Sequence, residues 1–127
     1  MAEKKRRILV VDDEKFMVTV VKDRLEASGY EVLTAGDGQE ALEKARSEGP
    51  DLIILDIMMP KLDGYQVCRM LKFDEKYNKI PIILFTARAQ SSDELLGKEV
   101  GADAYVVKPF TPSVLLAKIK ELLDKNK

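Results

Sequence analysis

Five residues with reactive or metal-binding side chains stand at the ends of short apolar runs. They are Asp12, Asp13, Asp56, Thr86 and Lys108, and they follow the runs at 8–11, 52–55, 80–85 and 103–107. Continuous apolar runs of this length are typical of strands buried on both faces in a parallel sheet. Because the carboxyl ends of parallel strands share one edge, where open α/β sheets bind their ligands, we expect the five side chains to converge there.

These residue types together indicate phosphoryl chemistry. Two carboxylates about 4 Å apart repel each other by roughly 4 kcal/mol at an effective dielectric constant near 20, and one lysine offsets only part of the repulsion among three. Mg²⁺ prefers such oxygen ligands and keeps open positions for phosphate oxygens. Asp56 could then act as the nucleophile that forms an aspartyl phosphate. The Thr86 hydroxyl and the Lys108 ammonium could stabilise the transferred group.

The elements that would position these residues alternate along the chain. Strands are expected at 8–11, 31–35, 51–56, 80–85 and 103–107, with helices at about 15–28, 38–48, 64–72, 91–100 and 112–123. The first helix is predicted from an apolar stripe that includes Met17, Val20, Val21 and Leu25, and Gly29 is expected to end it. This alternation predicts an α/β fold, with one five-stranded parallel sheet covered by helices on both faces.

Composition excludes several functional classes. A chain of 127 residues suits a single domain, and a net charge of −1 argues against direct nucleic-acid binding. No apolar run approaches the ~20 residues of a membrane span, and no signal peptide is evident, so we expect a cytoplasmic protein without membrane insertion. The single cysteine, Cys68, fits a reducing compartment and a buried structural thiol. Histidine is absent, so these residues cannot supply a phosphohistidine donor.

The motifs at the strand ends resemble those of a known family. They are Val10-Val11-Asp12-Asp13-Glu14, Leu55-Asp56-Ile57-Met58-Met59-Pro60-Lys61-Leu62-Asp63-Gly64, Phe85-Thr86-Ala87 and Tyr105-Val106-Val107-Lys108-Pro109-Phe110. With them the chain resembles the receiver domain of bacterial two-component response regulators, of the single-domain, chemotaxis-regulator-like kind. The resemblance covers residues 7–123 of a domain expected to span 1–127. It implies the flavodoxin-like strand order 2-1-3-4-5.

The resemblance also implies a role for each matching position. Asp56 is expected to be the phosphoacceptor. Asp12 and Asp13 are expected to hold Mg²⁺ together with Asp56 and the backbone carbonyl of Met58. Thr86 and Tyr105 resemble the switch residues of the family, and Lys108 resembles its phosphate-binding lysine. The peptide bond between Lys108 and Pro109 is expected to be cis.

The implied activity is a phosphorylation-dependent signalling switch, not a conventional enzyme. The domain would catalyse only its own phosphorylation and dephosphorylation. The phosphoryl group would come from a histidine kinase or a histidine phosphotransfer protein. An effector protein would then bind the face formed by the fourth helix, fifth strand and fifth helix, because phosphorylation biases a two-state equilibrium.

Four alternatives stay open from the residues alone. A haloacid-dehalogenase-type phosphatase needs a second aspartate two residues after the nucleophile, where this chain has Met58. A flavin-binding module needs a Gly/Ser/Thr-rich loop in place of Asp12-Asp13-Glu14. A degenerate receiver would bind partners without phosphorylation. The domain could also belong to a longer response regulator or hybrid kinase, although the starting methionine and short polar tail favour a stand-alone protein.

Overall fold

A computed structural model describes residues 5–59, 62–86, 101–107 and 111–125 of the chain. The described elements are, in chain order, β1 (Arg7–Val11), α1 (Lys15–Ala27), β2 (Glu31–Ala35), α2 (Gly38–Glu48), β3 (Leu52–Asp56), α3 (Gly64–Lys72), β4 (Ile82–Thr86), β5 (Ala104–Val107) and α5 (Pro112–Lys125). The helix expected at 91–100 lies outside the described residues.

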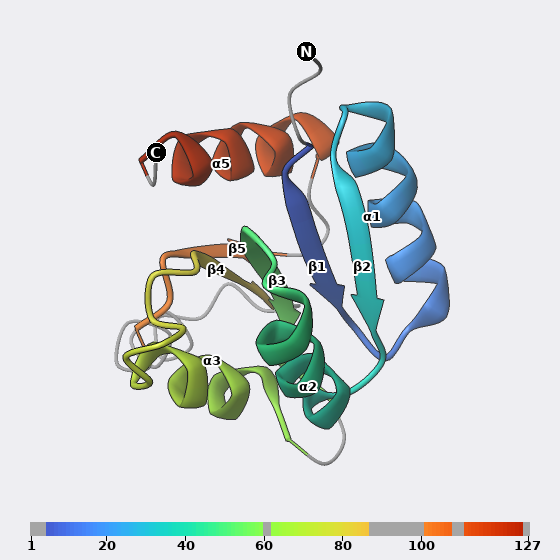
Figure 1. Ribbon diagram of the computed structural model, residues 1–127. Coiled ribbons are helices and arrows are strands. Elements are labelled where there is room, and N and C mark those ends of the chain that lie inside the picture. The colour runs from blue at the N-terminus through green and yellow to red at the C-terminus, as the bar shows by residue number, and fades with distance from the viewer. Residues whose placement is uncertain (1–4, 60–61, 87–100, 108–110, 126–127) are drawn as a thin grey trace.

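The five strands form one parallel sheet in the order β2-β1-β3-β4-β5. This is the strand order that the sequence resemblance implies, so the predicted fold class is confirmed. Figure 1 shows α2 and α3 on one side of the sheet and α1 and α5 on the other. Both faces of the sheet are therefore covered, as expected for strands that are apolar at nearly every position.

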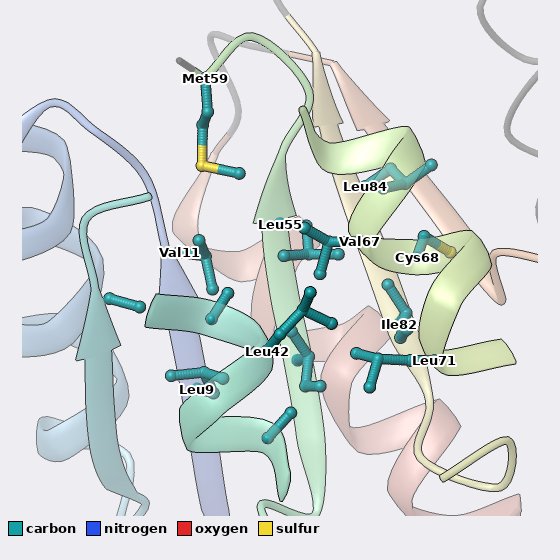
Figure 2. Close-up of a cluster of buried hydrophobic side chains, with 14 of the residues drawn as sticks. Leu9, Val11, Leu42, Leu55, Met59, Val67, Cys68, Leu71, Ile82 and Leu84 are labelled. Carbon is teal, nitrogen blue, oxygen red and sulfur yellow. The ribbon is translucent and has the colours of Figure 1, made fainter. Parts of the chain in front are cut away.

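Alternate residues of each central strand enter two separate hydrophobic clusters. In β3, for example, Ile53 and Leu55 face α2 and α3, whereas Leu52 and Ile54 face α1 and α5. Figure 2 shows the first cluster, in which side chains from the sheet meet Leu42 of α2 and the Val67, Cys68 and Leu71 side chains of α3. Burial on both faces fixes the register of β3, because a slip of one residue would exchange its two sets of side chains.

Local signals set the ends of the helices close to the positions predicted. Gly29, with a φ of +93°, follows the last turn of α1, and Gly49 ends α2 in the left-handed conformation. Asp37 caps α2, because its side chain accepts a hydrogen bond from the amide of Glu40. Pro112 is the first residue of α5, where a missing amide hydrogen costs nothing.

One expectation needs correction. Val20 belongs to the apolar stripe expected for the first helix, but it is 40% exposed, and only Val21 and Leu25 of α1 are buried. The buried part of α1 is narrower than the apolar stripe, because only one edge of this helix faces the sheet. At the start of β1, the guanidinium group of Arg7 pairs with Glu31 and Glu48. Among the described residues, no helix combines the length and the apolar character needed to cross a membrane.

Candidate functional site

Strand register brings Asp12 beside Asp56 at the carboxyl edge of the sheet. Val11 of β1 pairs with Leu55 of β3, so the next residues of the two strands, Asp12 and Asp56, stand at the same level. The amide of Asp12 also donates to the carbonyl of Ala35 at 3.2 Å, which ties the end of β1 to β2. Residues that are 44 positions apart in the sequence thus meet because of how the strands pair.

The carboxylates of Asp12, Asp13 and Asp56 form one cluster. Each offers one oxygen, and these three oxygens all lie within 4.8 Å of one another. Asp12 is 3% exposed and Asp56 is 6% exposed, whereas Asp13 is exposed to solvent. One oxygen of Asp12 accepts a hydrogen bond from the amide of Glu14 at 2.9 Å, which orients this carboxylate at the start of α1. The expected gathering of the three carboxylates is what the structure shows.

Such a cluster fits a bound cation. Charged carboxylates buried close together are costly unless they are paired or coordinate a metal. Three oxygens within 4.8 Å of one another can face one ion, and the hard oxygen donors suit Mg²⁺ or Ca²⁺. The cluster can therefore hold a metal, with two ligands set into the protein and the third, Asp13, reached from solvent.

An open pocket lies next to the cluster, between α1 and the β2–α2 connection. Asp12, Asp13, Lys15 and Glu40 line it with neighbouring residues of β2. The pKa of Glu40 is lowered, first because the Gly36 amide donates to its carboxylate and then because Lys44 bonds to it. Glu40 therefore stays ionised beside the carboxylates, and the ammonium group of Lys44 offsets its charge.

Backbone hydrogen bonds anchor the loop after β3 at Ile57 and at Gly64. The amide of Ile57 donates to the carbonyl of Phe85 at 3.0 Å, and the amide of Gly64 donates to the carbonyl of Ile57 at 3.0 Å. Met59 is buried and belongs to the cluster in Figure 2, whereas the Met58 side chain is 72% exposed. The Met58 side chain is thus directed to solvent beside the end of β3.

The remaining predicted site residues are only partly covered by the structure. Thr86 is the last residue of β4 and pairs with Val107 of β5, so its backbone lies at the same edge as Asp56. Tyr105 is half-buried and packs against the cluster that α2 and α3 cover. Lys108 follows Val107 directly in the sequence, but it lies outside the described residues, as does the Lys108–Pro109 bond.

The start of α3 contains a feature that the sequence analysis did not identify. Asp63 is the N-cap of this helix. Its carboxylate accepts from the amide of Gln66 at 2.9 Å, and the Gln66 side chain accepts from the amide of Asp63 at 3.0 Å. The spacing of Asp63 and Gln66 is that of a capping box, so the signal was present in the sequence.

Comparison with known proteins agrees with this site. Residues 8–120 match the family model of the response regulator receiver domain. Over 121 residues the chain is 49% identical to the alkaline phosphatase synthesis transcriptional regulatory protein PhoP of Bacillus subtilis (strain 168). The match covers 95% of this chain and 50% of that protein, so the chain spans about half the length of the curated relatives it matches.

Solved structures of receiver domains and related response regulators have the same fold as this chain. The chemotaxis protein CheY4 of Vibrio cholerae superimposes with a TM-score of 0.89 at 35% identity, covering 94% of this chain and 99% of that one. The receiver domain of the sensor histidine kinase PA1611 from Pseudomonas aeruginosa PAO1 superimposes with a TM-score of 0.88 at 30% identity, covering 95% and 99%. That structure holds a magnesium ion coordinated in its active site cleft. The chain belongs to the response regulator receiver domain family, and its function is phosphorylation-dependent two-component signalling.

Proposed function

We propose that Asp56 is the phosphoacceptor of this receiver domain. The observation that carries the proposal is the cluster of Asp12, Asp13 and Asp56, whose carboxylate oxygens lie within 4.8 Å of one another at the carboxyl edge of the sheet. Asp56 ends the central strand β3 and lies between β1 and β4 in the sheet. An oxygen of its carboxylate would attack the phosphorus of a phosphohistidine as the bond from phosphorus to the imidazole nitrogen breaks. The electron pair of that bond would stay on the imidazole.

We propose Mg²⁺ as the resident ion, held by Asp12, Asp13, Asp56 and the backbone carbonyl of Met58. When bound, Mg²⁺ would offset the negative charge of the carboxylates and of the transferred phosphoryl group. The magnesium ion in the related receiver of PA1611 supports this choice. The oxygen-only donor set and the solvent access through Asp13 support it too, because Mg²⁺ usually keeps several of its waters.

Phosphorylation of Asp56 would be detected by three residues, Thr86, Lys108 and Tyr105. The Thr86 hydroxyl would donate to a phosphoryl oxygen, and the Lys108 ammonium would neutralise its charge. Tyr105 would change position when Thr86 moves toward the phosphoryl group, and so bias a two-state equilibrium. The positions of Thr86 and Tyr105 in neighbouring strands β4 and β5 support this coupling.

Membership of the family implies a histidine kinase as a partner, and a histidine phosphotransfer protein could serve instead. The chain contains no histidine, so the donor must lie outside these 127 residues. The effector would bind a face that includes β5 and α5, and no direct nucleic-acid contact by this domain is expected. We further propose a cytoplasmic location and a single receiver domain over residues 1–127, with its core at 7–123. It would act either alone or within a longer regulator.

The test is Mg²⁺-dependent labelling with acetyl phosphate. Wild type should gain one acid-stable but base-labile phosphoryl group, as expected of an acyl phosphate, and the Asp56→Asn variant should gain none. Asp23→Asn is a matched control, because Asp23 is exposed on α1 and this variant should be labelled like wild type. Persistent labelling of Asp56→Asn would refute the assignment. Absence of both Mg²⁺ binding and labelling in wild type would favour a degenerate receiver.

A further inference from the structure

Gly64, the first residue of α3, approaches the backbone of the phosphoacceptor residue more closely than any side chain would allow. A Cβ atom on Gly64 would lie 2.4 Å from the carbonyl oxygen of Asp56 and 2.9 Å from the Cα of Ile57. Both neighbours are backbone atoms, so neither can move aside as the end of a flexible side chain could. The φ of Gly64 is not positive, so space alone, not backbone conformation, requires glycine here.

Helix α3 has little room to retreat from this contact. The start of α3 also packs against the first residue of α2, where a Cβ on Gly38 would lie 2.4 Å from the carbonyl oxygen of Leu62 and 3.0 Å from Val67. The capping box of Asp63 and Gln66 also fixes where α3 begins. The start of α3 is therefore confined between α2 and the peptide that joins Asp56 to Ile57.

The peptide on the other side of the contact leads directly to the metal site. The amide of Gly64 donates to the carbonyl of Ile57, and the next residue is Met58, whose own carbonyl is a proposed ligand. The amide of Ile57 is bonded to Phe85 of β4. An added methyl group at Gly64 would have to be relieved by a shift of the Asp56–Ile57 peptide, and that shift would carry the Asp56 side chain and the Met58 carbonyl with it.

We infer that Gly64 is a positioning residue for the phosphoacceptor site, because its lack of a side chain lets α3 hold the Asp56–Ile57 peptide in the geometry that binds the cation. The inference rests on the proposed function of Asp56. Substitution of a residue that holds metal ligands in position, without binding the metal itself, typically lowers metal affinity by ten- to a hundredfold. A glycine that mattered only for folding would change stability and leave the affinity of the folded protein unchanged.

The test compares Mg²⁺ affinity, measured by calorimetry on folded protein, among three alanine variants. Gly64→Ala should raise the Kd for Mg²⁺ by about tenfold or more. Gly29→Ala is the control for a methyl group added far from the site, after the last turn of α1, since nothing would lie within 4 Å of its Cβ. Gly49→Ala is the control for lost stability, because its φ of +58° strains alanine at the opposite end of β3 with open space around it. The Kd for Mg²⁺ of both control variants should stay within about twofold of the wild-type value, a much smaller change than that expected for Gly64→Ala.

The outcomes separate this inference from the proposed function. If wild type binds Mg²⁺ and folded Gly64→Ala binds it equally well, only the role of Gly64 is overturned. If wild type binds no Mg²⁺, the proposed function is overturned and the role of Gly64 with it. If Gly64→Ala does not fold, NMR spectra of the wild-type protein test the inference instead. Addition of Mg²⁺ should shift the Gly64 amide resonance far more than the Gly49 amide resonance. Equal or absent shifts of the two would overturn the inference.

Discussion

The ammonium nitrogen of Lys72, the last residue of α3, lies 2.6 Å from a carboxylate oxygen of Asp103, which directly precedes β5. The same ammonium group donates to the carbonyls of Asn78 and Ile80, at 3.1 and 2.8 Å. Asp103 in turn accepts from the amide of Ile82 at 2.8 Å. One largely buried lysine thus joins α3, the segment before β4 and the segment before β5, at the edge of the sheet opposite the carboxylate cluster.

We expect Lys72→Met to lower the free energy of unfolding by about 2 kcal/mol, because it leaves the partly buried carbonyl of Ile80 without this donor and Asp103 without its cation. Lys22→Met is the matched control: the Lys22–Glu26 pair is exposed and 3.9 Å long, so its loss should cost less than about 0.5 kcal/mol. Urea denaturation measures both. An equal decrease in the free energy of unfolding in the two variants would show that the Lys72 contacts contribute no more stability than an exposed ion pair. Mg²⁺ affinity should be unchanged in both.

Burial raises the pKa of the Cys68 thiol to about 12, and the nearby charge of Lys72 only partly opposes this. Native protein should therefore resist iodoacetamide at about pH 8.5, near the ordinary pKa of a free thiol. In urea the rate of alkylation should follow the unfolded fraction. Rapid alkylation of the native protein would contradict the burial of Cys68.

The same pKa has a consequence for stability. Because the folded-state pKa lies above the unfolded value, the contribution of the buried thiol is complete below about pH 9 and is lost as the pH rises toward about 12. The stability difference between wild type and Cys68→Ala should therefore shrink through this range. A difference that stays constant would place the thiol in a more polar setting than the structure shows.

Lys108→Ala tests the proposed division between phosphorylation and switching. Asp56 and the two acidic residues that follow β1 stay in place in this variant, so weak phosphorylation should persist. The switch should be lost, because the lysine no longer neutralises the phosphoryl group. Partner affinity of the phosphorylated variant, compared with that of unphosphorylated wild type, measures this. A phosphorylated variant that binds its partner as tightly as phosphorylated wild type would contradict the role of Lys108.

The strands and the acidic cluster could be predicted because each depends on a short local pattern. The apolar run at Leu52–Leu55 specifies a strand buried on both faces, and the parallel arrangement then brings Asp12 and Asp56 to one edge. The family motifs added the strand order, which the structure confirms, and the expected roles of individual residues, which stay predictions. Asp37 and Gly49 were predictable as helix ends because capping depends on the residue itself and its immediate neighbours.

Features that depend on tertiary packing could not be predicted in the same way. Val20 has the spacing of a core residue, but how α1 lies on the sheet decides which edge of the apolar stripe is buried. The Lys72–Asp103 pair joins residues 31 positions apart, and no local pattern marks it. The need for glycine at position 64 arises from the backbone of β3, which the sequence around Gly64 does not reveal.

Chemical mapping of the phosphorylated residue tests the central claim most directly. Borohydride reduces an aspartyl phosphate to homoserine, so peptide mass spectrometry can locate the acceptor after treatment of the protein with acetyl phosphate and Mg²⁺. We predict homoserine at position 56, dependent on both the donor and Mg²⁺. Homoserine at position 12, 13 or 63, or at no position while the protein is folded and binds Mg²⁺, would contradict the assignment of Asp56.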